Sequence, residues 1–145
     1  MTWNTGMFTS FRLDWRTPQG VYDTLNEEFN FDFDPAPVDY TVDGLTIPWG
    51  KRTFCNPPYG RYVGRWVKKG WDESQTGKLV VMLLASRTDT SWWHKYVMKG
   101  EIRFIKGRLK FDGQDNSAPF PSAIVVFRPK QGFLSGVGSW FRRSK

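Results

Sequence analysis

Residues 79–85 form a continuous apolar run, Leu-Val-Val-Met-Leu-Leu-Ala. A strand with one face in water alternates apolar and polar side chains, so an unbroken run predicts a strand that is buried on both faces. Such strands are typical of the centre of a sheet with helices packed on both sides. The segment therefore predicts an α/β fold, and 145 residues are enough for one domain with its own core.

Helical patterns precede and follow this strand. Thr17-Pro18 is typical of a helix start, with threonine as the N-cap and proline at the first helical position. Val21, Leu25 and Phe29 then recur every four residues, which predicts a helix with one apolar face. Two further helices are predicted, over residues 61–74 and 92–96.

Shorter strands complete the pattern. They are predicted at residues 31–34, 53–55, 101–111 with a break at Gly107, and 123–127. The last two strands can pair as a hairpin, so the sheet is predicted to be mixed in direction. We expect one compact domain over residues 1–128 and a basic tail over residues 129–145.

Composition excludes several classes of site. No stretch approaches the ~20 apolar residues of a membrane span, and no secretory signal pattern opens the chain. The single cysteine, Cys55, cannot form an intramolecular disulfide, and with the single histidine, His94, it makes a Cys/His zinc site implausible. We therefore expect a cytoplasmic protein with no bound metal and no membrane partner.

Charge divides the chain into two unlike parts. Residues 1–50 carry two arginines against eight carboxylates, a net charge of −6, whereas residues 51–145 carry 19 Lys/Arg against six carboxylates, a net charge of +13. An acidic first third suits a small cationic ligand. A basic remainder suits a polyanion, because neutralising phosphates releases counterions. A basic protein that has no such partner is the alternative.

The tetrapeptide Asn56-Pro57-Pro58-Tyr59 directly follows the predicted strand 53–55. Open α/β sheets place ligand sites at the carboxyl ends of their strands. The prolines lack N–H groups, so the backbone carbonyls here are not committed to a regular ladder. Asn56 adds an amide oxygen and Tyr59 a flat ring, which suit the exocyclic amino group of a planar base. A proline-rich turn that binds nothing is the alternative.

The tetrapeptide resembles the catalytic motif of S-adenosylmethionine-dependent methyltransferases that act on adenine N6, cytosine N4 or glutamine amides. Five further segments narrow the resemblance to the small phage-type DNA N6-adenine methyltransferases, a Dam-like family. They are residues 14–18, 31–36, 85–90, 107–111 and 118–122. The resemblance runs from about Ser10 to Phe127 and implies a reduced Rossmann-like methyltransferase fold.

The family resemblance implies a mechanism of base flipping and direct methyl transfer. The Asn56 side-chain oxygen and the Pro57 carbonyl would accept the hydrogens of the adenine amino group, and Tyr59 would stack on the extruded base. Pro58 completes the predicted catalytic motif.

The cofactor and the DNA are each assigned a predicted set of residues. The start of the first helix, at Thr17 and Pro18, suits the methionine carboxylate of S-adenosylmethionine. Other cofactor candidates follow or lie in the strand 31–34: Asp34, Ala36 and, more weakly, Asp32. For DNA, basic residues of the helix 61–74 form a predicted stripe of Arg61, Arg65, Lys68 and Lys69, although a plain solvated helix face has the same pattern. Further DNA candidates are Arg87, Asp89, Trp92 and Arg108.

The chain also departs from larger methyltransferases. It has no glycine-rich loop after the first strand, and only 21 residues separate Asp34 from Asn56. It has no room for a separate target-recognition domain, so recognition of DNA could depend on a homodimer. Two other functions stay open: an inactive relative that binds nucleic acid, and a methyltransferase that acts on glutamine in proteins.

Overall fold

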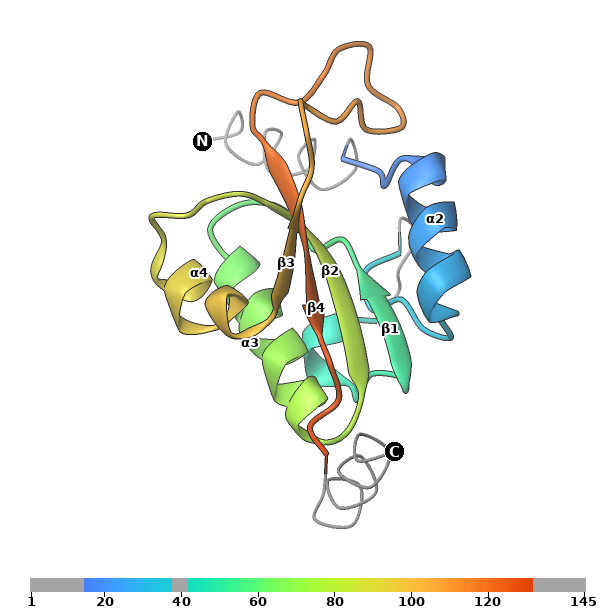
Figure 1. Ribbon diagram of the computed structural model, residues 1–145, viewed down its shortest axis with the longest axis vertical. Coiled ribbons are helices and arrows are strands. Elements are labelled where there is room, and N and C mark those ends of the chain that lie inside the picture. Colours follow the sequence, from blue (N-terminus) through green and yellow to red (C-terminus); the bar gives the residue numbers. More distant parts are fainter. Residues whose placement is uncertain (1–14, 38–41, 132–145) are drawn as a thin grey trace, which may run out of the picture.

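The computed structural model describes residues 15–37 and 42–131. The predicted arm at residues 1–13 and most of the predicted tail lie outside the described residues. Helices and strands alternate along the chain (Figure 1): α2 (Gln19–Phe29), the 3-10 turn η1 (Gly44–Thr46), β1 (Arg52–Cys55), α3 (Val63–Gln75), β2 (Leu79–Ala85), α4 (Ser91–Lys95), the 3-10 turn η2 (Val97–Lys99), β3 (Glu101–Phe104) and β4 (Ser122–Phe127).

The four strands form one sheet in the order β1-β2-β4-β3. β1 and β2 are parallel, whereas β4 runs antiparallel to both of its neighbours, β2 and β3. The sheet is therefore mixed in direction, as the sequence predicted. The apolar run of β2 lies between two strands, and Leu79 to Leu84 are all buried, which confirms the strand buried on both faces.

Helices cover both faces of the sheet (Figure 1). On one face α3 and α4 pack through Trp66, Val67 and Trp93 against the even-numbered residues of β2. On the other face α2 packs through Leu25 and Phe29 against the odd-numbered residues of β2. The α3 helix lies so close to the sheet that a Cβ atom on Gly70 would come within 2.7 Å of the Met82 sulfur. Glycine at this position is what permits the close approach.

Three predicted elements differ in the structure. The α2 helix has Pro18 as its N-cap with no side-chain cap, so Thr17 is not the cap residue. Residues 31–34 do not form a strand. Only Phe33 is bridged to β1, opposite Thr53, because Phe31 and Phe33 pack into cores on opposite sides of the sheet. The strand predicted over 101–111 ends at Phe104, where exposed Lys and Gly residues follow.

Residues 105–121 form an irregular segment between β3 and β4, which we call the strap. It projects beyond the end of the sheet and returns toward α2 (Figure 1). Asp112 of the strap forms an isolated bridge with Arg16, and its carboxylate accepts the N–H of Gln19 at 3.1 Å. The strap is thereby held against the beginning of α2.

Candidate functional site

The carboxyl ends of the two parallel strands meet at one edge of the sheet. Asn56 follows β1 and Ser86 follows β2, so the predicted catalytic tetrapeptide and the loop of residues 86–90 both leave the sheet at this edge. The antiparallel β4 begins there, and the start of α2 and the strap lie at the same end of the molecule (Figure 1). This edge gathers segments that are far apart in the sequence.

The Asn56 amide is held in one orientation. Its Nδ2 group donates to the Trp15 carbonyl at 2.8 Å and to the Thr17 hydroxyl at 3.1 Å. Since a backbone carbonyl can only accept, the nitrogen must face Trp15 and the oxygen must face away. That oxygen, Oδ1, is buried and has no hydrogen-bond partner among the described residues. The site therefore holds a prepositioned acceptor whose burial without a partner costs about 1–3 kcal/mol.

Four aromatic rings cluster beside this amide, and they come from three segments that are far apart in the sequence. The ring of Tyr59 meets Phe120 and Phe111 edge-on at centroid distances of 5.4 Å and 6.1 Å. Trp15 contacts the same two phenylalanines at 5.2 Å each. Burial raises the pKa of the Tyr59 phenol, so its hydroxyl stays protonated. The hydroxyl lies 3.4 Å from the Leu83 carbonyl.

Asp34 lies at the same edge as Asn56. The parallel bridge between Phe33 and Thr53 makes both segments run toward it, and the charge of Asp34 contributes to the raised pKa of the Cys55 thiol, although burial of the thiol is the larger cause. The Asp34 residue as a whole is exposed, yet surrounding protein atoms desolvate its carboxyl and raise the pKa to about 6. The N–H of Ala36, which donates to the Asp34 carboxylate at 2.8 Å, opposes this rise.

Other predicted cofactor residues have different surroundings. The Asp32 carboxylate accepts the N–H of Arg52 at 3.1 Å, at the amino end of β1, so the structure does not bring Asp32 to the carboxyl edge. Pro18 is the N-cap of α2. It lies close to Asn56, because its neighbour Thr17 accepts a hydrogen bond from the Asn56 amide. The first helical N–H of α2, that of Gln19, already donates to the Asp112 carboxylate.

The predicted basic stripe on α3 divides into two parts. Lys68 pairs with Asp72 at 2.6 Å, and Lys69 lies 3.6 Å from Glu73. Arg61 and Arg65 instead place their guanidinium groups 5.0 Å and 4.6 Å from the ring centre of Tyr62. Neither arginine has a carboxylate within salt-bridge distance in the described ranges 15–37 and 42–131. The unneutralised charge thus lies at the start of α3, next to the tetrapeptide.

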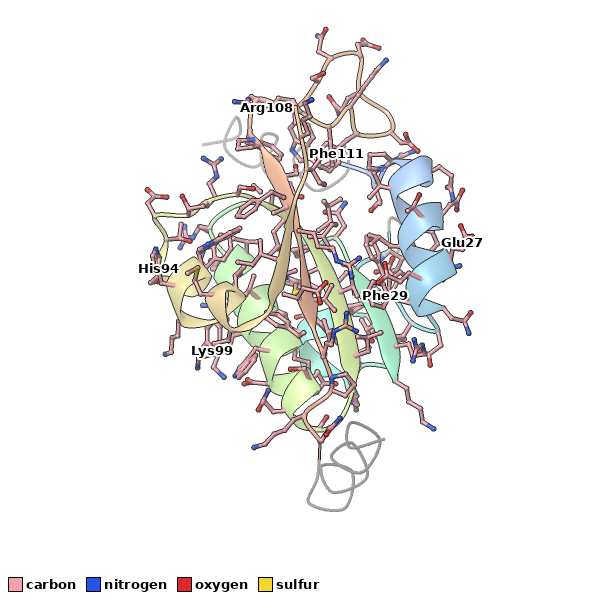
Figure 2. The ribbon with its side chains drawn as sticks, in the orientation of Figure 1. Glu27, Phe29, His94, Lys99, Arg108 and Phe111 are labelled. Carbon is pink, nitrogen blue, oxygen red and sulfur yellow. The ribbon has the colours of Figure 1, made fainter. Side chains whose placement is uncertain are left out.

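The remaining DNA candidates surround the same edge. Arg87 and Asp89 are exposed in the loop after β2, and the Arg87 guanidinium lies 5.9 Å from the ring centre of Phe120. Trp92 is half-buried and packs so closely on α3 that a Cβ atom on Gly64 would lie 3.0 Å from it. Arg108 is exposed on the strap, and Figure 2 shows it near Phe111 at the strap end of the molecule, away from Lys99 and Phe29.

Sequence reasoning missed several residues of this site. The roles of the Trp15 carbonyl and the Thr17 hydroxyl in orienting Asn56 were not predicted, nor were the contacts of Phe111 and Phe120 with Tyr59. A signal was present, because all four residues belong to segments that carry the family resemblance. The physical role of those segments emerges only when the chain is folded.

The part of the chain that the structure describes lacks two further features. It holds no group of three or more His, Cys, Asp or Glu side chains placed to bind a metal ion. None of its helices combines the length and the apolar character that crossing a membrane requires.

Comparison with known proteins gives one family. The family model described as "DNA N-6-adenine-methyltransferase (Dam)" matches residues 5–137, which is most of the chain. No curated protein and no solved structure matches the chain significantly. The matched region includes every described segment of the site, from Trp15 to the strap. The chain therefore belongs to the Dam family of DNA N-6-adenine-methyltransferases.

Proposed function

We propose that this protein methylates the N6 amino group of adenine in DNA, using S-adenosylmethionine, on a reduced Rossmann-like fold. The observation that carries the proposal is the Asn56 amide, whose oxygen is oriented by two hydrogen bonds from its nitrogen and is buried without a partner. An acceptor of this kind suits an amino group that must lose conjugation with its ring. Membership of the family supplies the reaction class.

The methyl transfer needs preorganised hydrogen-bond acceptors from the protein rather than a general base. The lone pair of adenine N6 is delocalised into the ring, and N6 becomes nucleophilic as it pyramidalises. The Asn56 oxygen and the Pro57 carbonyl accept its two hydrogens, favour that geometry and stabilise the positive charge that develops on nitrogen. The alkylated nitrogen is acidic enough to release one proton to water. Correct positioning of the reactants supplies much of the remaining rate.

The cofactor fits the donor set at this edge. The Asp34 carboxyl, desolvated and beside the Asn56 segment, matches a ligand that brings a cationic group or hydroxyls. Asp34, Ala36 and the segment Thr17-Pro18 are the residues that would hold it. When bound, S-adenosylmethionine supplies a methyl group that leaves its sulfonium for N6. Asp32 is the weaker candidate, because its carboxylate is already bonded to the backbone of Arg52.

Access to the acceptor requires movement of a neighbouring segment. The Asn56 oxygen is buried, and the Tyr59 ring is in contact with Phe111 and Phe120. Both phenylalanines belong to the strap, which lacks helix and strand. We therefore assign the opening movement to the strap, after which Tyr59 stacks on the extruded base, a contact worth about 1–3 kcal/mol in single-strand binding.

The proposal is tested by methyl transfer from labelled S-adenosylmethionine to plasmid DNA, followed by sequencing of the modified bases. We expect N6-methyladenine in DNA incubated with the wild-type protein. Cofactor binding measured by calorimetry, without methylation of any nucleic acid, would exclude the proposed activity. Transfer of label to glutamine of a protein instead would assign the reaction to the amide methyltransferases.

The Thr17 hydroxyl gives a first variant pair. Thr17→Val removes one of the two acceptors that orient the Asn56 amide, so we expect kcat to fall about fivefold, since one hydrogen bond contributes about 1 kcal/mol. Thr17→Ser keeps the hydroxyl and is expected to stay within about twofold of the wild type. Single-turnover methylation at saturating DNA measures both. A loss that appears only in the KM for DNA would contradict an orienting role.

The two parts of the basic stripe on α3 give a second pair of variants. Arg65→Ala removes a cation without a carboxylate partner, so we expect the Kd for DNA to rise about three- to tenfold and the slope of log Kd against log salt to change by about 1. Lys68→Ala makes the same change in net charge one turn further from the tetrapeptide, at a side chain paired with Asp72, and is expected to change Kd less than about twofold. Equal effects of the two variants would show that only net charge matters.

A further inference from the structure

Phe104 is a large apolar side chain in an unusual position. It is the last residue of β3, an outer strand of the described sheet, and 69% of its surface is exposed. Its neighbour Arg103 turns toward α2, where its guanidinium binds the Glu28 carboxylate through two hydrogen bonds of 2.7 Å and 2.8 Å. Side chains alternate along a strand, so Phe104 points to the opposite face. Described residues leave it uncovered there.

The register of the sheet places Phe104 level with the candidate active site. Phe104 pairs with Ala123 of β4, and Ala123 pairs with Leu84 near the carboxyl end of β2. Phe104 therefore lies at the same edge as Asn56. Three strand spacings separate β3 from β1, a lateral distance of about 14 Å. An extended ligand that crosses this edge can reach both residues.

The charge next to Phe104 favours a polyanion at this surface. Lys106, Arg108 and Lys110 are exposed on the strap, and they alternate with Leu109 and Phe111, which pack inward. None of the three cations has a carboxylate within salt-bridge distance among the residues that the structure describes. Figure 2 shows Arg108 on the strap, beyond the end of the sheet. An apolar ring beside unneutralised cations suits stacked bases flanked by phosphates.

We infer that Phe104 enters the base stack of duplex DNA at the step from which the target adenine is turned out. The inference rests on the proposed function, since it assumes that the adenine leaves the stack. Apolar side chains that enter a base step compensate for lost stacking and help to kink the duplex. Lys106 and Arg108 then hold the phosphates that flank the opened step. The ring has no such role on a strand whose adenine is already unpaired.

The test compares Phe104→Ala with the matched control Met98→Ala. Met98 is also an exposed apolar residue, at 56%, but it lies in η2, before the amino end of β3. We expect Phe104→Ala to lower kcat/KM on duplex DNA at least tenfold and on single-stranded DNA less than twofold. Placing an abasic position opposite the target adenine is expected to restore the kcat/KM of Phe104→Ala on duplex DNA, because the adenine then leaves the stack more easily. Met98→Ala is expected to match the wild type on all three substrates.

A second measurement does not depend on methyl transfer. Duplexes with 2-aminopurine at the target position brighten when that base leaves the stack. The wild type is expected to increase the emission, and Phe104→Ala to increase it at least threefold less at equal occupancy of the DNA. If the wild type methylates no DNA but still brightens the probe, the proposed function fails while the inference stands.

Three outcomes would overturn the inference. Equal losses on single-stranded and duplex DNA would assign Phe104 to general binding. An unchanged kcat/KM on duplex DNA would remove it from the reaction. Dissociation of a wild-type dimer by Phe104→Ala, measured by sedimentation, would assign the exposed ring to contact with a second copy of the chain.

Discussion

Replacing Asn56 by alanine is expected to lower kcat for adenine methylation by about 10²–10³-fold, the loss typical of removing one preorganised dipole at a reacting group. The variant removes the oxygen that would accept an amino hydrogen. It removes the bonds to Trp15 and Thr17 as well, but these hold the amide rather than the DNA. The Kd for DNA is therefore expected to change less than about threefold. Single-turnover methyl transfer and equilibrium DNA binding measure the two quantities separately.

The stability of this variant provides its control. Asn56→Ala leaves the Trp15 carbonyl without its side-chain donor but also removes a buried acceptor that has no partner. These two effects oppose one another, so the free energy of unfolding is expected to change by about 1 kcal/mol or less. A kcat within tenfold of the wild type would exclude Asn56 as the acceptor. A parallel loss of DNA binding and thermal stability would point to damage of the fold.

Replacing Asp34 by asparagine is expected to weaken binding of S-adenosylmethionine about 10- to 100-fold, since hydrogen bonds to charged groups contribute about 1.5–3 kcal/mol. The same change is expected to raise the Tm of the free protein. Burial raises the pKa of Asp34 to about 6 from an ordinary value of 3.8, so the ionised carboxylate opposes folding. Asparagine removes this cost, which is smaller than the full shift implies because the residue is exposed. Loss of binding with a gain in stability is the signature of a functional site.

The pH dependence of the Asp34 variant follows from the direction of this shift. Between about pH 4 and 6 the unfolded chain ionises Asp34 while the folded protein keeps it protonated, so wild-type stability falls as pH rises through this range. The difference in Tm between Asp34→Asn and the wild type is therefore expected to grow from pH 4 to 6 and to stay constant above pH 6. Thermal scans across pH measure it. A lower Tm for the variant at pH 7 would show that the carboxylate stabilises the fold.

The sequence predicted the parts of the fold that depend on local patterns. The buried strand β2 follows from its continuous apolar run, and the α3 helix with its buried Trp66 and Val67 follows from helical periodicity. The position of Asn56 follows from the end of the short strand that precedes it. The pairing of Lys68 with Asp72 is also a local effect, because it spans one helical turn. The basic stripe was predicted without counting these acidic partners. Its division into free arginines and paired lysines could have been found from the spacing.

The remaining features depend on contacts between distant segments. Thr17 and Asn56 are 39 residues apart, so no local pattern indicates that the Thr17 hydroxyl accepts a hydrogen bond from the Asn56 amide. Phe31 and Phe33 have the spacing of one strand face, but they pack into the two cores on opposite sides of the sheet. The sequence of the strap as a whole shows no periodic pattern of apolar residues. Its phenylalanines are placed by Trp15 and Tyr59, which no local pattern connects to them.

The order of strands in the sheet also affects how the protein is made. β4, the last strand of the described chain, lies between β2 and β3 rather than at the margin of the sheet. Until residues 122–127 leave the ribosome, the apolar β2 strand lacks one of its two neighbours, and β3 has no partner in the sheet. The nascent chain therefore carries an open, strongly apolar strand from the time β2 is made until β4 follows, a state that is prone to aggregation. Its sheet closes in a single late event.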